Sequence, residues 1–571
     1  MKAFFRSFLA SLLAIVVVLV VIVAAIGIKV SKKPSIKDHS YLVVDVYGEI
    51  LPYFPPDGVI AEILGGEPET LHRILSNLEK AAADKRIEGV ILKVSSNNSL
   101  GLASLEEVRG AVAKVRDAGK KVYAFSDSMD RNSLYLVSAC DSIIMPVTGY
   151  VNFAGFGGAL MYVKGALDKL GIKPNLHQIE DYKSAAELVT RTDMSPEARE
   201  MRNWILDDIW ELQIGAISED RGISENRILE LMEHVLFTVD EAKEAGLVDE
   251  ILYWDELDAR LRREDDKKLR TVSQKTYAGV ERSKVGLKGK KKIAIVHAHG
   301  MIGGRESHVD PLMGVIMGHE TVSAELRRVR RDKDVAAVVF RVESNGGEGL
   351  ASDLISHEVA VLAGEKPVVA SMIDVAASGG YMIAYRADKI VADPTTITGS
   401  IGSISAKFNT VGFYNKLGIT FDHITKGPNG LFWSSQHDFT EEQRRRFEEN
   451  HWDGFNWWLR DVSEYREIPF DDLKDLAMGR VWTGRQAKQN RLIDEVGGLD
   501  RAIELAKELA EIPEDEEVTI VHYPKKKGLL AALTGGGTGT SAIRRILYQF
   551  IRQDLAQSLE LLANSESVID Q

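Results

Sequence analysis

One serine in this chain lies in surroundings that suit nucleophilic chemistry. Ser378 belongs to the run DVAASGGY (residues 374–381), which follows an expected strand and precedes an expected helix. Small neighbours keep a serine hydroxyl accessible, and a helix start adds a positive field, so the run resembles a nucleophile elbow. It is not G-x-S-x-G, because Ala376 replaces the first glycine. A serine that merely caps the helix is the alternative interpretation.

A serine hydroxyl attacks poorly without a base, and Lys183 is the candidate base. It lies in the run DYKSAA (residues 181–186). A lysine with a pKa near 10.4 is protonated at neutral pH, and burial in an apolar pocket lowers that pKa so that the amine can accept a proton. Considered alone, the same lysine fits a solvated position on a helix surface.

Paired glycines form a third candidate element. Gly346 and Gly347 end the run SNGG (residues 344–347) after another expected strand. Glycines let the backbone approach a ligand closely and adopt positive φ, and their amides can then point at an oxyanion. An ordinary tight turn explains the same pair.

The elements that must position these residues come in two copies, offset by about 247 residues. The matching segments keep the same order along the chain: Val90–Val108 with Val338–Ile355, Lys120–Ile144 with Lys366–Ile390, Leu170–Pro174 with Leu417–Phe421, and Ala242–Ile251 with Ala487–Val496. The serine run and the glycine pair occur only in the second copy, where Ser378 stands opposite Asn132 of the first. Lys183 belongs to the first copy.

Each copy alternates short apolar strands with amphipathic helices, which predicts βαβ units and a mainly parallel sheet. The fold class is therefore α/β, a tandem duplication with an N-terminal transmembrane helix. The expected divisions are an anchor (1–32), a first domain (33–259), a charged linker (260–292), a second domain (293–512) and a tail with an amphipathic helix (513–571).

The anchor is expected because Ser7–Ile28 carries no charge. A helix of roughly 20 apolar residues spans a bilayer, whereas a cleaved signal peptide has a shorter apolar core. Lysines and arginines flank the segment on both sides, so the charge pattern alone does not give its orientation.

Composition excludes some functions. The net charge of -13 argues against a nucleic-acid-binding protein and fits a solvated acidic surface. The single cysteine, Cys140, lies in an apolar segment and is expected in the core. The pair His297 and His299 has no third ligand beside it, so neither a metal nor a cofactor is expected. The segment Trp452–Trp458 is expected to pack in a core or subunit contact, or to line a peptide groove.

Taken together, the motifs resemble the S49 family of serine peptidases in its long, duplicated form, the signal peptide peptidase A (protease IV) type. The resemblance covers about Phe4 to Ile512 and is most specific in YKSA around Lys183, DVAASGGYMIA around Ser378, and TGSIGSI at Thr398–Ile404. It implies a fold related to crotonase and Clp protease. It also implies a homotetramer on the outer face of the bacterial inner membrane that degrades released signal peptides.

Carried onto this sequence, the resemblance makes Ser378 the nucleophile, Lys183 the general base, and Ser400 the group that orients the lysine. Gly379, with Gly346 or Gly347, would supply amides to the oxyanion. Asn345 stands where the family has proline, which leaves the amide directions open. Two other functions remain as alternatives: a crotonase-like acyl-CoA enzyme, and a non-catalytic membrane scaffold.

Overall fold

The computed structural model describes residues 35–53, 68–310 and 313–525. The expected anchor (1–32) and the amphipathic helix expected within 541–563 lie outside these residues. Within the three described ranges, no helix has both the length and the apolar character needed to cross a membrane.

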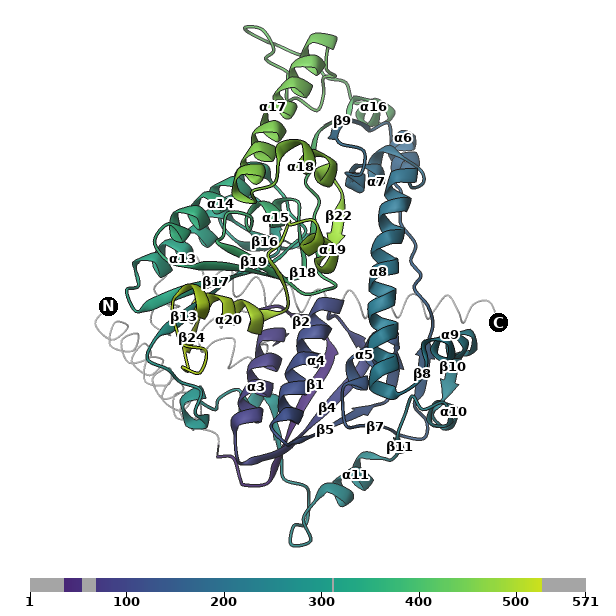
Figure 1. The fold of residues 1–571 in the computed structure, drawn as a ribbon. Helices are drawn as coiled ribbons and strands as arrows, with labels where there is room; N and C mark the ends of the chain where they lie inside the picture. Colours follow the sequence, from purple (N-terminus) through teal and green to yellow (C-terminus); the bar gives the residue numbers. More distant parts are fainter. Residues whose placement is uncertain (1–34, 54–67, 311–312, 526–571) are drawn as a thin grey trace, which may run out of the picture.

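The first repeat is built on a parallel sheet whose six described strands run in the order β11-β7-β5-β4-β1-β12. These are β1 (Ser40–Gly48), β4 (Ile87–Asn98), β5 (Lys121–Ser126), β7 (Ser142–Met145), β11 (Glu250–Ile251) and β12 (Thr271–Ser273). Helices α3 (Leu71–Ala83), α4 (Leu102–Asp117) and α5 (Arg131–Ser138) pack their apolar side chains into one core with this sheet (Figure 1).

The second repeat has the same strand order, β23-β19-β18-β17-β13-β24. These are β13 (Lys292–His299), β17 (Val335–Ser344), β18 (Val368–Ala377), β19 (Lys389–Ala392), β23 (Glu495–Val496) and β24 (Thr519–Tyr523). Two further strands extend the sheet from β18: β20 (Ile397–Gly399) and β22 (Val481–Thr483). The predicted duplication is confirmed as a repeated strand order.

Helices cover both faces of the second sheet. Side chains of α13 (His319–Arg331) and α14 (Gly349–Ala363) pack on one face, and those of α20 (Leu499–Leu509) pack on the other. Both sets of alternating side chains in β17 are therefore buried, which explains its nearly continuous apolar sequence. Of its two charged residues, Arg341 and Glu343, Arg341 forms an ion pair with Glu107 of α4 in the first repeat, and the side chains of that pair are buried.

The last strand of each repeat lies outside the two domain ranges expected from sequence. β12 falls within 260–292 and pairs with β1, while β24 falls within 513–571 and pairs with β13. Both strands occupy the same edge position in their sheets. Each is short and follows a charged segment, so neither produces a strong sequence signal.

Two structural elements join the repeats, the long helix α8 and a two-stranded antiparallel ladder. Helix α8 (Pro196–Arg221) contacts the first repeat through Gln213, whose amide donates to Asn132, and the second through Trp204, which donates to the Val481 carbonyl. The antiparallel pair β9 (Lys173–Ile179) and β21 (Ser403–Asn409) joins a strand from each repeat (Figure 1).

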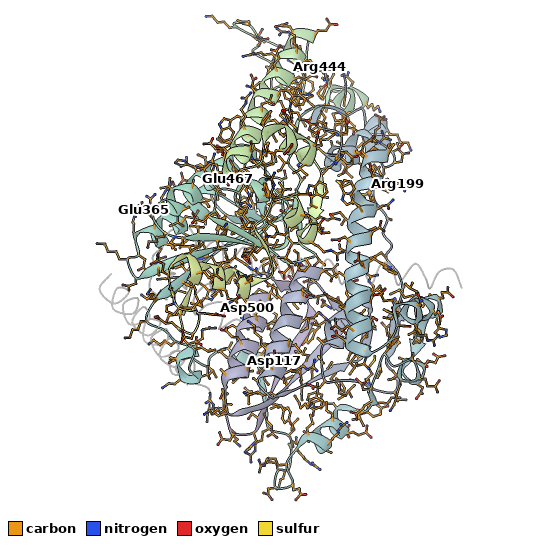
Figure 2. The ribbon with its side chains drawn as sticks, in the orientation of Figure 1. Asp117, Arg199, Glu365, Arg444, Glu467 and Asp500 are labelled. Carbon is orange, nitrogen blue, oxygen red and sulfur yellow. The ribbon has the colours of Figure 1, made fainter. Side chains whose placement is uncertain are left out.

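The other residues singled out from the sequence have ordinary structural places. Cys140 is buried, as predicted. Helix α17 (Glu441–Tyr465) buries Phe455 and Trp458 in the core of the second repeat and leaves Trp457 partly exposed. Charged side chains of both signs, such as Asp117 and Arg199, lie on the surface (Figure 2).

Candidate active site

Lys183, Ser378 and Ser400 come together at the junction of the two repeats. The Lys183 Nζ lies 3.0 Å from Ser378 Oγ, 2.8 Å from Ser400 Oγ and 2.6 Å from the Ser400 carbonyl oxygen. Lys183 and Ser378 are 195 residues apart in the chain. All three contacts are made within one chain.

Ser378 sits at a sharp turn between β18 and the short helix α15 (Gly379–Met382). Its φ of 56° and ψ of -119° lie outside the favoured regions for a residue with a side chain, and such strained conformations cluster at functional sites. The Ser378 amide donates to the Gly399 carbonyl at 2.9 Å, which ties the turn to β20. The turn leaves the hydroxyl partly accessible and directed at the lysine.

Lys183 is buried, with only 6 % of its surface exposed. Burial lowers the pKa of its amine to about 7. The three oxygens that contact Nζ belong to neutral groups, and among the described residues no carboxylate opposes the effect of burial. Near neutral pH a substantial fraction of Lys183 is therefore uncharged and able to accept a proton.

A loop that sequence analysis did not select holds Lys183 and Ser400 together. This loop comprises residues 478–480. The Met478 carbonyl accepts from the Tyr182 amide, and the Arg480 carbonyl accepts from the Ser400 amide. Between them, the Gly479 amide donates to the Ile401 carbonyl. Gly479 has a φ of +77°, and a Cβ there would lie 2.4 Å from the Lys183 nitrogen. The sequence signal was absent, because a glycine after a helix is typical of any helix end.

The paired glycines adopt positive φ, 101° at Gly346 and 153° at Gly347. The Gly346 amide donates to Ser344 Oγ at 3.1 Å. Within the residues that the structure describes, the amides of Gly347 and Gly379 donate to no acceptor. A Cβ on Gly379 would lie 3.0 Å from the Gly347 nitrogen, so these two amides are neighbours beside Ser378.

The first repeat has no comparable arrangement. Asn132, at the position of Ser378, accepts from Arg131 and Gln213 through its side-chain oxygen. The duplicated halves therefore differ at the position of the candidate nucleophile.

The histidine pair lies elsewhere. The ring of His297 stacks on Tyr53 with centroids 3.7 Å apart, and its Nε2 is 3.0 Å from Nδ1 of His522. In the part of the chain that the structure describes, no group of three or more His, Cys, Asp or Glu side chains could hold a metal ion.

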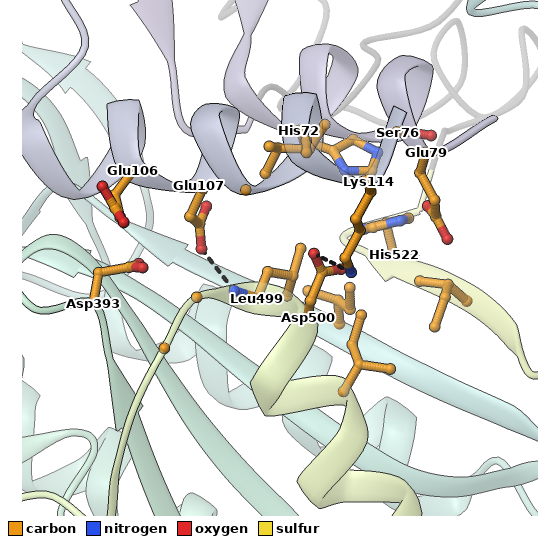
Figure 3. A pocket seen from close by; sticks show the side chains of 18 of the residues that line it. His72, Ser76, Glu79, Glu106, Glu107, Lys114, Asp393, Leu499, Asp500 and His522 are labelled. Carbon is orange, nitrogen blue, oxygen red and sulfur yellow. Dashed lines mark hydrogen bonds and ion pairs between the residues drawn. The ribbon is translucent and has the colours of Figure 1, made fainter. Parts of the chain in front are cut away.

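A cavity of about 360 Å³ also lies between the repeats, but Lys183, Ser378 and Ser400 are not among its lining residues. Glu107 accepts from the Leu499 amide at its edge (Figure 3).

Comparison with known proteins finds one family twice in the chain, once in each repeat. The family model described as Peptidase family S49 matches residues 114–269 and again 360–513. The chain belongs to peptidase family S49. The first match contains Lys183, and the second contains Ser378 and Ser400.

Curated relatives agree with this assignment. The chain is 34% identical over 485 residues to the chloroplastic serine protease SPPA of Arabidopsis thaliana, covering 84% of this chain and 71% of that one. It is 32% identical over 462 residues to Protease 4 of Haemophilus influenzae, covering 77% and 73%. The predicted S49 membership is confirmed, and the protein is a serine protease.

Superposition on a mutant of ClpP1 from Listeria monocytogenes covers 37% of this chain and 94% of that one at 14% identity. The TM-score of 0.24 is too low to establish a common fold. The α/β class and the duplicated S49 domain stand on the strand order and the family match, whereas a relation to the crotonase and Clp folds stays a prediction.

Proposed function

We propose that this S49 protease cleaves peptide bonds with a Ser/Lys dyad in which Ser378 is the nucleophile and Lys183 the general base. The observation that carries the proposal is the 3.0 Å contact between Ser378 Oγ and the Nζ of a buried Lys183 whose other contacts are the neutral oxygens of Ser400. A neutral lysine is required for that role, and burial supplies it.

The reaction begins when Ser378 Oγ attacks the peptide carbonyl carbon and its proton passes to the neutral Lys183 amine. The carbonyl oxygen becomes an oxyanion, which accepts hydrogen bonds from the Gly347 and Gly379 amides. Lys183 then returns the proton to the leaving amine, and an acyl-enzyme on Ser378 remains. Water, deprotonated by Lys183, attacks the ester carbonyl and releases the second peptide product. The Lys183 ammonium then protonates the departing Ser378 Oγ, which restores the serine hydroxyl and the neutral amine.

The hydrogen bonds of Ser400 give it a positioning role. Its hydroxyl and its carbonyl oxygen both contact Lys183 Nζ, so the amine is held toward Ser378. Of the two glycines considered for the oxyanion, Gly347 is the better candidate, since the Gly346 amide is already donated to Ser344.

The substrates we propose are extended, apolar peptides, cleaved signal peptides among them. Leu350 and Leu354 lie one helical turn apart on α14, directly after the glycine loop, with 66% and 37% of their surfaces exposed. Such side chains favour apolar peptide segments. In this proposal the Ser7–Ile28 segment anchors the protease in the bacterial inner membrane, with a homotetramer of catalytic domains on the extracytoplasmic side.

The test is hydrolysis of a fluorogenic apolar peptide by purified protein, with covalent labelling of Ser378 by a fluorophosphonate. Ser378→Ala and Lys183→Ala should each lose hydrolysis, whereas Lys173→Ala, an exposed lysine on β9, should keep it. Substantial turnover by either dyad variant would refute the assignment. Failure of folded wild-type protein to label at Ser378 would favour a scaffold, and thioesterase activity without peptidase activity would favour a crotonase-like enzyme.

A further inference from the structure

Strand β18 is irregular just before Ser378. Its register with β17 passes from Val342 opposite Met372 to Ser344 opposite Ala376. One residue of β17, Glu343, therefore faces three residues of β18, 373–375. The extra residues form a bulge, and bulges bend a strand and redirect the side chains that follow.

The bulge leaves backbone amides without partners in the ladder, and the Glu343 side chain accepts them. Its Oε2 lies 2.7 Å from the Asp374 nitrogen and 3.2 Å from the Val375 nitrogen. Unpaired backbone amides are costly inside a protein, so this carboxyl group stabilises the bulged form of the strand.

The side chain of Asp374 connects the same bulge to the first repeat. Its Oδ1 accepts from the Ser104 amide at 2.9 Å, and its Oδ2 accepts from the Ser104 hydroxyl, both in the first turn of α4. A Cβ on Gly101, the residue before α4, would lie 2.3 Å from the Asp374 carboxyl carbon. The bulge is thus fixed from both repeats.

The first repeat has serines in place of the two acids. In register with the second copy, Ser95 stands at the position of Glu343 and Ser128 at that of Asp374. Their hydroxyl oxygens lie 3.3 Å apart, and the β4–β5 ladder ends at Val94 and Ser126, the counterparts of Val342 and Met372. The two acids occur in the copy that carries Ser378.

We propose that Glu343 and Asp374 are positioning residues for the nucleophile: Glu343 fixes the bulge of β18, Asp374 fastens the bulge to α4, and together they aim Ser378 at Lys183. This inference rests on the proposed Ser/Lys dyad. It adds two residues, four and thirty-five positions from the serine, that act on the reaction without touching the substrate.

The Glu343–Asp374 pair also predicts a second pH dependence of the site, beside that of Lys183. Burial, together with the charge of Asp374, raises the pKa of Glu343 to about 8, while the hydrogen bonds from the Val375 and Asp374 amides, and the charge of Arg341, oppose the shift. Two titratable residues flank Glu343 on the neighbouring strands. His299 of β13 is in register with Glu343, and Asp374 of β18 donates its amide to the Glu343 carboxyl. Below about pH 8 the Glu343 carboxyl is mostly neutral. Above it, two carboxylates repel each other at the bulge, so the aim of Ser378 should worsen.

The test compares Glu343→Ala, Glu343→Gln and Asp374→Ala with Asp388→Ala in the full-length protein. Asp388 is a matched control, because its carboxylate accepts the Val368 amide at the opposite end of the same strand, at 2.7 Å. Rates of fluorophosphonate labelling at Ser378 and of peptide hydrolysis are measured against pH, with thermal unfolding as the check of folding.

Glu343→Ala and Asp374→Ala should each lower kcat and the labelling rate about 100-fold with little change in KM, as expected when a reacting group is misplaced. Asp388→Ala should leave both rates near wild type. Glu343→Gln keeps an oxygen acceptor but does not titrate, so it should retain activity at pH 7 and lose the decline above pH 8.

Equal labelling rates for Glu343→Ala and Asp388→Ala would overturn the inference and leave the dyad standing. So would a Glu343→Gln variant that keeps the wild-type decline above pH 8, which is measurable even where Glu343→Ala does not fold. Wild-type protein that does not label at Ser378 would overturn the dyad itself, and the inference with it.

Discussion

Ile179 of the first repeat is paired with Ser403 of the second in the antiparallel ladder of β9 and β21. Lys183 follows Ile179 by four residues, and Ser400 precedes Ser403 by three. One short ladder therefore delivers the candidate base and its hydrogen-bond partner to the same place. The Lys183–Ser378 contact forms within one chain as a result.

Mixing Ser378→Ala chains with Lys183→Ala chains should not restore hydrolysis, since each chain would hold one defective site and no complete one. The measurement is peptide cleavage after co-expression of the two variants. Co-expression of either variant with wild-type protein is the control and should retain the wild-type share of activity. Recovery in the mixture of two variants would mean that the site also assembles across subunits.

The acylation rate should rise with pH through about 7, because burial lowers the pKa of Lys183 to about 7 and only the neutral amine accepts the serine proton. Lys183→Arg should be inactive at every pH, since a guanidinium stays charged. The measurement is the rate of Ser378 labelling between pH 5 and about 8. A rate independent of pH over that interval would contradict the assigned base.

Ser400→Ala should reduce kcat by about 10-fold, because one of the oxygen contacts that hold Nζ is lost while the Ser400 carbonyl and Ser378 contacts remain. Ser403→Ala is the matched control in the neighbouring strand. Its hydroxyl lies 2.7 Å from His451 Nε2 rather than near the lysine. Similar losses in the two variants would remove the special role of Ser400.

Gly479→Ala should greatly reduce activity, since the added Cβ would meet the Lys183 backbone at 2.4 Å. Gly222→Ala tests the backbone strain alone. That glycine has a φ of +64° at the end of α8 and open space around its Cβ position. Both variants should lose some stability, but only Gly479→Ala should lose labelling of Ser378 in folded protein.

Glu107→Ala should lower the free energy of unfolding by about 3–5 kcal/mol, because it leaves the buried Arg341 charge without its partner. Replacing both residues, as Glu107→Leu with Arg341→Met, should cost less than the single change. Urea unfolding of the purified protein measures the difference. A single variant as stable as wild type would show that the ion pair does not join the repeats.

Much of the fold was predictable from local pattern. Continuous apolar strands such as β17, bounded by turn residues, indicated a parallel sheet covered on both faces, and internal similarity indicated two copies. The closing strands β12 and β24 were not predicted as parts of the repeats. They are short, and their pairing partners β1 and β13 lie more than 200 residues away in the chain.

The candidate members of the site could be selected from the sequence, but the residues that support them could not. Ser378, Lys183 and Ser400 were selected by residue type, by neighbours and by a family resemblance. Gly479, the Glu343 bulge and the Asp374 contact were not, because each depends on which segments pack together. Nothing local to Asp374 indicates that its carboxylate meets Ser104, 270 residues away.

The sequence by itself determined the duplicated α/β plan, the serine-protease family and the candidate chemistry. These properties follow from the spacing of apolar residues along the chain and from short motifs, and both can be read from the sequence without knowing which segments pack together. The tertiary structure alone decided that Lys183 is buried beside Ser378 and that the Gly346 amide is already occupied. A pKa and a hydrogen bond depend on distance and on solvent exclusion, and both arise only when segments from the two repeats pack against each other.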